Sequence, residues 1–295
     1  QAETAQEVRS LIGAGRKNLI INGDFRVSQR GDYTTATSAA NGVYTLDRHQ
    51  SLVDTVGVTF QDLGGELKYA ATSSATGRFG FQQRIEEYTK LRGKQVTLSA
   101  KVTSNTSDVQ LMISDGSTLT SVNHSGSGSE EILTVTATLS SSASLARAYV
   151  FVSNNNLDVS VTTGDYFSVK ELQLEVGSVA TDFEHRSYGE ELALCQRYFT
   201  RSKNFIGMCN NAGNGVEGYI WFDVEMRTAP SLAQDSPFSI NDVANNYTQS
   251  GNNIIIYSPT TRGAFVTMAN FTGLTAFRPC ASRGLGGDIL ADAEL

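Results

Sequence analysis

The sequence predicts an all-β protein made of antiparallel strands. Many short segments alternate apolar and polar residues with a period of two, and Gly, Ser, Thr and Asn residues separate them. In residues 95–102 this alternation places four apolar side chains on one face: Val96, Leu98, Ala100 and Val102. Alternating strands with one apolar face pack as two antiparallel sheets, which favours a sandwich over a parallel α/β sheet.

The length of 295 residues suits two domains, each with its own core. The four prolines all lie in the last third of the chain, and this change in turn chemistry predicts a boundary near residue 187. We therefore expect an N-terminal helical attachment segment (1–16), a jelly-roll sandwich (17–186), a linking helix (187–200) and a smaller β-sandwich domain for oligomerisation or receptor binding (201–295).

The first element is a short amphipathic helix within residues 1–15. Ala5, Val8, Leu11 and Ile12 recur at helical spacing, and Gly13 follows them as a stop signal. So short a helix cannot bury an apolar stripe by itself, and we expect it to pack against partner chains.

The strands of the first domain follow, in residues 79–85, 95–102, 109–113 and 133–139 among others. Residues 166–176 change phase, because Phe167 and Val169 share one parity whereas Leu172 and Leu174 share the other. A switch at Lys170–Glu171 predicts a bulge or a bend. The Gly- and Ser-rich residues 114–131 predict a solvated loop, with a mobile recognition loop as the alternative.

Residues 187–200 predict the linking helix. Ser187 and Glu190 have the spacing of a capping box. The apolar stripe is wider than one neighbouring surface requires, so we expect it to contact the other domain or a sister chain. This predicted interface consists of Leu192, Leu194, Cys195, Tyr198 and Phe199, with Cys195 as a packing thiol.

The second domain returns to alternation, most clearly over residues 216–226. Further strands are expected in residues 252–258 and 263–271, and a short terminal strand in residues 286–295. A small domain rich in Gly and Asn gains stability by pairing with copies of itself.

Composition excludes several classes of function. The net charge of −7 argues against binding to duplex nucleic acid and to anionic lipid. No segment approaches the roughly 18 apolar residues of a membrane-spanning helix, and no signal peptide is visible. Three scattered cysteines indicate reduced thiols and assembly in a cytosol.

Catalytic motifs are missing from the sequence. The glycines of GNGVEG (213–218) fit a dinucleotide fingerprint by spacing, but a strand and not a helix follows them. His49, His124 and His185 lie far apart. Each Glu doublet, such as Glu86–Glu87, points to opposite faces of a strand and does not form a cleft pair. We expect no enzymatic activity, no metal and no cofactor.

Two rows of side chains are candidate contact surfaces. Residues 145–153 (LARAYVFVS) place Arg147, Tyr149 and Phe151 on one face, either as a glycan platform or within a central strand that is buried on both sides. Residues 216–226 place Tyr219, Trp221 and Asp223 together, either as a glycan platform or as part of a subunit interface.

Several segments resemble a group of bacteriophage tail-fibre and appendage proteins. They are GRKNLIINGDFRVSQRG (15–31), YTLDRH (44–49), LRGKQVTLSAKV (91–102), QLEVGSVATDFEHRSYGEELALCQRYF (173–199) and VEMRTAPS (224–231). The first domain is also similar to the jelly rolls of carbohydrate-binding modules. Its opening matches theirs at Asn18, Leu19, Asn22, Gly23 and Phe25.

The resemblance to carbohydrate-binding modules also bears on metal binding. Related modules hold a structural calcium through a Glu after the Phe and an Asp near the last strand. Arg26 and Ser168 occupy those places in this chain, although Asp24 and Asp165 are nearby. No calcium is expected through that set of ligands.

The resemblance to tail fibres implies a virion protein that is assembled in the host cytoplasm, forms a homotrimer and binds a host surface polysaccharide. It also implies contacts with other tail proteins through the N-terminus. Two alternatives stay open, a glycan-cleaving tailspike and a structural adaptor of the tail.

Overall fold

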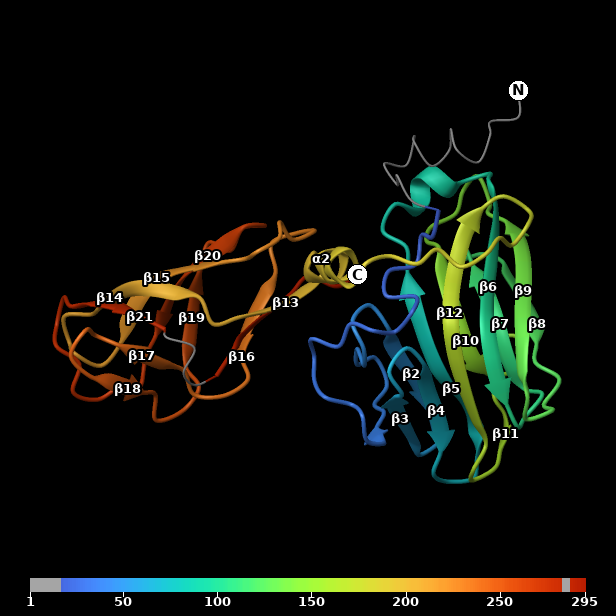
Figure 1. Cartoon of the computed structure of the whole chain (residues 1–295), viewed down its shortest axis with the longest axis horizontal. Coiled ribbons are helices and arrows are strands. Elements are labelled where there is room, and N and C mark those ends of the chain that lie inside the picture. Colours follow the sequence, from blue (N-terminus) through green and yellow to red (C-terminus); the bar gives the residue numbers. More distant parts are fainter. Residues whose placement is uncertain (1–16, 283–286) are drawn as a thin grey trace. The chain divides into compact units, whose positions relative to one another are not determined.

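The computed structural model describes residues 17–282 and 287–295, and it confirms the all-β fold class (Figure 1). The expected N-terminal helix lies outside these residues. The chain divides into two compact units, one that runs to Glu191 and includes Leu295, and one that spans Leu192–Glu294. Each unit is an antiparallel β structure.

The first unit is a jelly-roll-like sandwich of two antiparallel sheets. The first sheet has the order β1-β3-β4-β12-β6-β9. Its strands are Thr37–Ser38, Val58–Asp62, Leu67–Ala71, Tyr166–Val176, Gln95–Ser104 and Glu130–Thr138. The second sheet has the order β11-β5-β10-β7-β8, with β2 also paired to β5. Its strands are Val159–Val161, Ala75–Arg84, Arg147–Val152, Val109–Ser114, Leu119–Asn123 and Gln50–Asp54.

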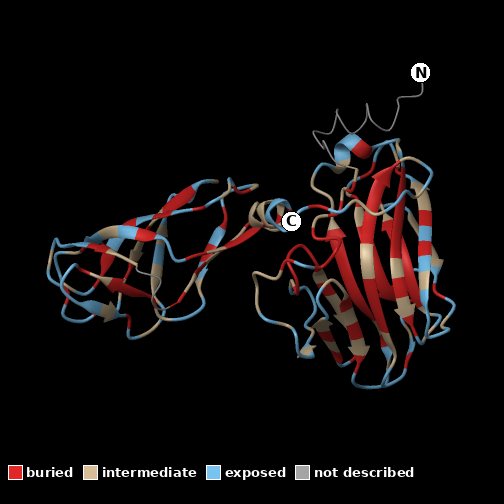
Figure 2. Cartoon of the chain, in the orientation of Figure 1, coloured by how far each residue is buried: buried red, intermediate tan, exposed pale blue. Residues whose placement is uncertain are grey.

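The core of this unit lies between the two sheets. Figure 2 shows that many positions along the strands of this unit are buried. The four residues that alternation placed inward in 95–102 all belong to this core. Stacked rings add to it, since the centroids of Tyr69 and Phe167 lie 5.5 Å apart with an interplanar angle of 8°. Burial of each large apolar side chain contributes about 1.5–3 kcal/mol. The period-two pattern therefore identified the core face of these strands correctly.

The phase change in β12 is a β-bulge, as predicted. The register between β12 and β6 shifts between Lys170 and Gln173, and Glu171 has a φ of 52°. The extra residue lets both Val169 and Leu172 enter the core.

Residues 114–131 differ from the expected loop, because β8 forms within them and pairs with β7. The buried Asp115 explains this difference. Its Oδ1 accepts hydrogen bonds from the backbone N–H groups of Ser117 (2.9 Å) and Thr118 (2.7 Å), and its Oδ2 accepts one from the N–H of Ser140 (2.8 Å). These bonds fix a tight turn between the two strands.

The second unit contains a three-stranded sheet, β13-β22-β16, and a seven-stranded sheet, β18-β17-β21-β14-β15-β20-β19. The three-stranded sheet consists of Phe199–Ser202, Ile289–Asp292 and Ser231–Gln234. The strands of the other sheet are Asn246–Thr248, Ser239–Asn241, Pro279–Ala281, Phe205–Cys209, Val216–Trp221, Gly263–Met268 and Ile254–Tyr257. Their inward side chains form a separate core that includes Phe205, Ile220, Phe238 and Val266.

Helix α2 spans Tyr188–Gln196 and is shorter than the expected 187–200. The capping box is present, because the Glu190 N–H donates to the Ser187 Oγ (3.4 Å) and the Ser187 N–H donates to the Glu190 carboxylate (3.1 Å). Strand pairing replaces the helix after Gln196. Phe199 pairs with Asp292 in β22, and the Ala293 N–H donates to the Tyr198 carbonyl (2.7 Å). The stripe predicted over 187–200 is therefore not a single helical face. A further short helix, the 3-10 helix Tyr88–Leu91, lies between β5 and β6.

Candidate functional site

The predicted Arg147–Tyr149–Phe151 row lies on the outer face of the second sheet of the first unit. In the register between β10 and β5, Arg147 faces Arg84, Tyr149 faces Gln82 and Phe151 faces Gly80. On the far side of β5, Gln82 faces Gln50 of β2. We call the surface formed by Gln50, Gln82, Arg84, Arg147 and Tyr149 the arginine face.

The aromatic rings of this row are covered and not exposed. Tyr149 is 6% and Phe151 is 2% exposed, and they pack with Met112 and the half-buried Leu52 and Leu119. Of the two interpretations of this row, the central strand buried on both sides therefore holds for both rings, and the exposed platform does not. The half-buried Arg147 remains accessible.

A close approach of two strands fixes the Phe151 ring. A Cβ atom at Gly80 would lie 2.2 Å from the Val150 carbonyl oxygen and 2.7 Å from Cδ2 of the Phe151 ring. Only glycine allows this packing. The ring is thus part of a rigid floor beside the arginine face.

Several polar atoms of the arginine face are buried without a hydrogen-bond partner. Gln82 Nε2 donates to Gln50 Oε1 (2.7 Å), which leaves Gln82 Oε1 unpaired. Nη1 of Arg147 donates to the Tyr149 hydroxyl (3.3 Å), and Nη1 of Arg84 donates to the main-chain oxygen of Leu295 (3.0 Å). The Nε atoms of both arginines are buried and unpaired. Buried polar groups in native structures are normally paired, so these atoms need an explanation.

The opposite end of the same sheet face is fully paired by comparison. Arg78 lies near the carboxylates of Asp54 (3.6 Å) and Asp158 (3.4 Å). Gln110 donates to Asn123 (3.0 Å) and accepts from the Asn155 N–H (2.8 Å). The missing partners are therefore confined to the arginine end.

The second predicted row lies on the outer face of the seven-stranded sheet. Tyr219 and Trp221 are about half exposed, and their ring centroids lie 5.9 Å apart with an interplanar angle of 28°. In the strand register Tyr219 faces Ile206 on one side and Phe265 on the other, and Phe265 faces Tyr257. We call the surface formed by Ile206, Tyr219, Trp221, Tyr257 and Phe265 the aromatic face.

Asp223 is not part of the aromatic face. Strand β15 ends at Trp221, and Asp223 lies in the exposed bend that follows. The nearby Glu225 forms an exposed ion pair with Arg262 (2.9 Å). The structure thus brings together Tyr219 and Trp221 but separates Asp223 from their sheet face.

The predicted interface residues around α2 have unequal exposure. Cys195, Tyr198 and Phe199 are buried, whereas Leu192 and Leu194 are half-buried. Cys195 is a reduced, fully buried thiol. A homotypic contact through this set stays a prediction, with Leu192 and Leu194 as its accessible members.

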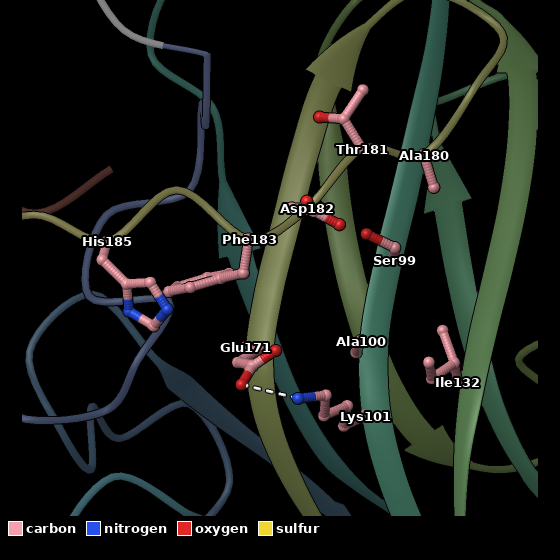
Figure 3. Close-up of a pocket in the computed structure, with 10 residues that line it drawn as sticks. All are labelled: Ser99, Ala100, Lys101, Ile132, Glu171, Ala180, Thr181, Asp182, Phe183 and His185. Carbon is pink, nitrogen blue, oxygen red and sulfur yellow. Dashed lines mark hydrogen bonds and ion pairs between the residues drawn. The ribbon is translucent and has the colours of Figure 1, made fainter.

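A pocket of about 500 Å³ opens on the outer face of the first sheet (Figure 3). Its floor carries an ion pair between Lys101 Nζ and the Glu171 carboxylate (2.8 Å). Its wall is the segment after β12, where the Phe183 and His185 rings meet edge to face with centroids 5.0 Å apart. The other lining residues are Ser99, Ala100, Ile132, Ala180, Thr181 and Asp182. The sequence did not predict this pocket.

The wall of the pocket depends on two buried side chains of β12. Gln173 donates to the Thr181 carbonyl (3.1 Å) and accepts from the Glu184 N–H (2.9 Å). Glu175 accepts from the N–H of Thr181 (2.8 Å). Polar residues at alternate positions of a predicted strand were the only sequence signal for a chain segment above this face.

The carboxylates of Asp24 and Asp165, which lie near the expected calcium ligands in the sequence, have partners within the first unit. Asp24 pairs with Arg26, and Asp165 accepts from the Thr162 N–H (2.7 Å). The Arg26 guanidinium also donates to the Arg186 carbonyl (2.8 Å). Within residues 17–282 and 287–295, no three His, Cys, Asp or Glu side chains are grouped to hold a metal ion.

The titratable groups with strong shifts are structural. Burial lowers the pKa of His49 to about 4, although its Nε2 lies 2.9 Å from the Asn22 carbonyl oxygen, so its ring is neutral at pH 7. Burial raises the pKa of the Cys280 thiol to about 12 and also raises the pKa of Cys209. Neither thiol is a ready nucleophile at neutral pH.

In the described part of the chain, no helix is long and apolar enough to cross a membrane.

Comparison with known proteins gives only distant similarities in strand arrangement. No protein-family model matches the chain, and no curated protein matches it. A structure of TmCBM61 in complex with β-1,4-galactotriose is 13% identical, with a TM-score of 0.34, and covers 55% of this chain and 100% of its own. A CBM4 structure is 18% identical, with a TM-score of 0.33, and covers 53% and 98%.

A third similar structure is the enzymatically active domain of bacteriophage CBA120 tailspike protein 4. It is 13% identical, has a TM-score of 0.33 and covers 54% of this chain but 21% of its own. None of these low-scoring similarities assigns a function to this chain.

Proposed function

We propose that this protein is a non-enzymatic adsorption protein of a phage tail that binds a host cell-surface glycan as a homotrimer. The first unit binds the glycan, and the second unit holds the subunits together. The segment over residues 1–16 contacts other tail proteins. The particle assembles in the host cytoplasm.

The arginine face carries the glycan-binding part of the proposal. Planar amide and guanidinium groups of Gln50, Gln82, Arg84 and Arg147 lie side by side there, next to the Tyr149 hydroxyl. Sugars offer many hydroxyl groups that both donate and accept, and planar groups of this kind match them with directional hydrogen bonds. The unpaired buried atoms Gln82 Oε1, Arg84 Nε and Arg147 Nε supply unused hydrogen-bonding capacity.

The aromatic face supports self-association. Ile206 is 63% exposed, and Tyr219, Trp221 and Tyr257 are each about half exposed, on neighbouring strands of one sheet. Contiguous exposed apolar surface of this kind marks an interaction site, and aromatic residues are enriched at subunit interfaces. We therefore favour the interface interpretation of Tyr219 and Trp221 over the glycan platform. Three copies would also convert weak single-site binding into firm attachment.

The experiment is a binding assay of the full chain on a panel of purified bacterial surface polysaccharides, with the chain length of each polysaccharide followed over time. The proposal expects binding to at least one member without chain shortening. Sedimentation of the same preparation should give three chains per particle.

Each alternative function has its own outcome in this assay. Steady shortening of a bound polysaccharide would support the glycan-cleaving tailspike. The structural adaptor would be supported if the protein bound no member of the panel and particle assembly still required the protein.

A further inference from the structure

The arginine face places two positive charges next to each other. Arg84 of β5 and Arg147 of β10 are directly opposed in the antiparallel register and share the outer face of the sheet. Like charges directly opposite each other on neighbouring strands destabilise a sheet. Two like charges in this position, without an opposite charge from the protein beside them, are typical of a functional site.

Acidic side chains do not compensate this pair. Within residues 17–282 and 287–295, Arg84 and Arg147 form no ion pair with Asp or Glu side chains. Arg84 donates to an oxygen of Leu295, the last residue of the sequence, and Arg147 donates to the Tyr149 hydroxyl. Acidic partners are not scarce, since the chain has 30 Asp and Glu residues and a net charge of −7. Arg78, six residues before Arg84 on β5, lies near two carboxylates.

The geometry of the two arginines suits an external anion. Both Nε atoms are buried and unpaired, so the hydrogen-bonding capacity of the two guanidinium groups is not used up within the protein. Both side chains are half-buried, and guanidinium N–H groups match carboxylate and phosphate oxygens in geometry. The hydroxyl of Tyr149 lies within hydrogen-bond distance of Arg147, and Gln82 is one register step further along β5. The anionic group is thus flanked by groups that hydrogen-bond to sugar hydroxyls.

We propose that the arginine face binds the anionic substituent of an acidic sugar, so that the receptor polysaccharide is a polyanion. This inference rests on the proposed glycan-binding function and specifies its ligand class. The substituent is a carboxylate or a phosphate, since both match the planar fork of arginine. Two neighbouring guanidinium groups favour an anion over a neutral sugar, because a neutral sugar would leave the charge of Arg147 without an acidic partner.

The test uses the full chain on an array of purified acidic and neutral bacterial polysaccharides. Each acidic member is also printed after reduction of its carboxyl groups and after removal of its phosphates. Four variants accompany the native protein: Arg84→Gln, Arg147→Gln, Arg147→Lys and the control Arg78→Gln. Thermal unfolding of each variant shows whether the fold is intact.

We expect binding to acidic members only, and loss of binding after whichever treatment removes the anionic group. Affinity should fall at least about tenfold in Arg84→Gln and in Arg147→Gln, as for the loss of a charged hydrogen bond. It should fall less in Arg147→Lys, which keeps the charge without the fork, and stay unchanged in Arg78→Gln. Higher salt should weaken binding of the native protein.

Two outcomes would overturn the inference in distinguishable ways. Equal binding to neutral and acidic members, unchanged in folded Arg84→Gln and Arg147→Gln variants, would refute the acidic ligand and leave glycan binding standing. Absence of binding to all members would refute both the ligand class and the proposed function.

Discussion

The two units present sheet faces of opposite character to the surface. The arginine face has half-buried charged and amide groups beside covered rings, since Tyr149 and Phe151 are at most 6% exposed. The aromatic face has exposed rings, and Tyr219 and Trp221 are about half exposed. Each unit has two aromatic residues at alternate positions of one strand. These rings are buried in the first unit and exposed in the second.

The difference follows from what surrounds each strand. Strand β10 is flanked by β5 and β7, and Leu52, Met112 and Leu119 pack around its outward rings. The outward rings of β15 lie beside other members of the aromatic face. The unpaired polar atoms of the first unit support the proposed ligand site, and the exposed apolar area of the second unit supports the proposed subunit interface.

The largest expected effect is on self-association. Ile206→Asp introduces a charge into the aromatic face, and this charge would have to be desolvated in any homotypic contact through that face. We expect the homotrimer to dissociate to monomers in sedimentation, with the β-sheet circular dichroism unchanged. Val243→Asp is the control, because Val243 is 77% exposed and lies outside the aromatic face. A trimeric Ile206→Asp variant would show that this face is not the interface.

The second prediction separates the rings by their effect on stability. Phe151→Ala should lower the free energy of unfolding by about 3–5 kcal/mol, because it leaves a cavity beneath a covered surface. Trp221→Ala should lower it by less than about 1 kcal/mol in the monomer, since half of the ring already faces solvent. Urea denaturation at protein concentrations too low for self-association measures both free energies of unfolding. Equal losses would contradict the contrast between the two faces.

A smaller effect is expected from the turn beside the arginine face. Burial alone would raise the pKa of Asp115, but hydrogen bonds from the N–H groups of Ser140, Thr118 and Ser117 outweigh it and lower the pKa well below its usual range. The ionised carboxylate therefore stabilises the fold at pH values above about 4, which is the pKa of Asp in an unfolded chain. This contribution is lost as the pH falls below that value.

Asp115→Asn tests this point by removing the charge. The variant should be less stable by about 1–3 kcal/mol at pH 7. The difference from the native protein should shrink as the pH falls below about 4, because the Asp115 carboxyl of the unfolded chain then takes up a proton while that of the folded chain is still ionised. Thermal unfolding across pH 2–7 measures it, and a difference independent of pH would contradict the role of the charge.

The smallest effect concerns the helix within which the two units divide. Glu190→Ala removes the carboxylate that accepts the Ser187 N–H in the capping box. It should lower the free energy of unfolding by about 0.5–1 kcal/mol. Helix α2 should fray at its N-terminus, which amide hydrogen exchange would detect. Gly189→Ala, at a neighbouring position with open space around it, serves as the control that leaves the cap intact.

Local patterns predicted the parts of the fold that depend on neighbours in sequence. Period-two alternation found the core strands, the phase change at Lys170–Glu171 found the bulge, and the spacing of Ser187 and Glu190 found the helix start. The end of α2 was misplaced because pairing of Phe199 with Asp292, far along the chain, replaces the helix there.

The site was predicted only in part, for the same reason. Arg147 and Tyr149 were singled out by their parity on one strand. Arg84 and Gln82 were missed, because their position opposite these residues depends on the register of two strands about 60 residues apart. The pocket beside Lys101 was missed because its wall is held in place by tertiary hydrogen bonds from Gln173 and Glu175.

The most direct test of the central claim measures polysaccharide binding to two full-length variants by titration calorimetry. For Arg147→Gln, we predict an intact trimer whose affinity for the polysaccharide falls at least about tenfold. For Ile206→Asp, we predict a monomer that keeps its single-site affinity but loses the gain from multivalency. The account would be contradicted if Arg147→Gln bound like the native protein while Ile206→Asp abolished single-site binding.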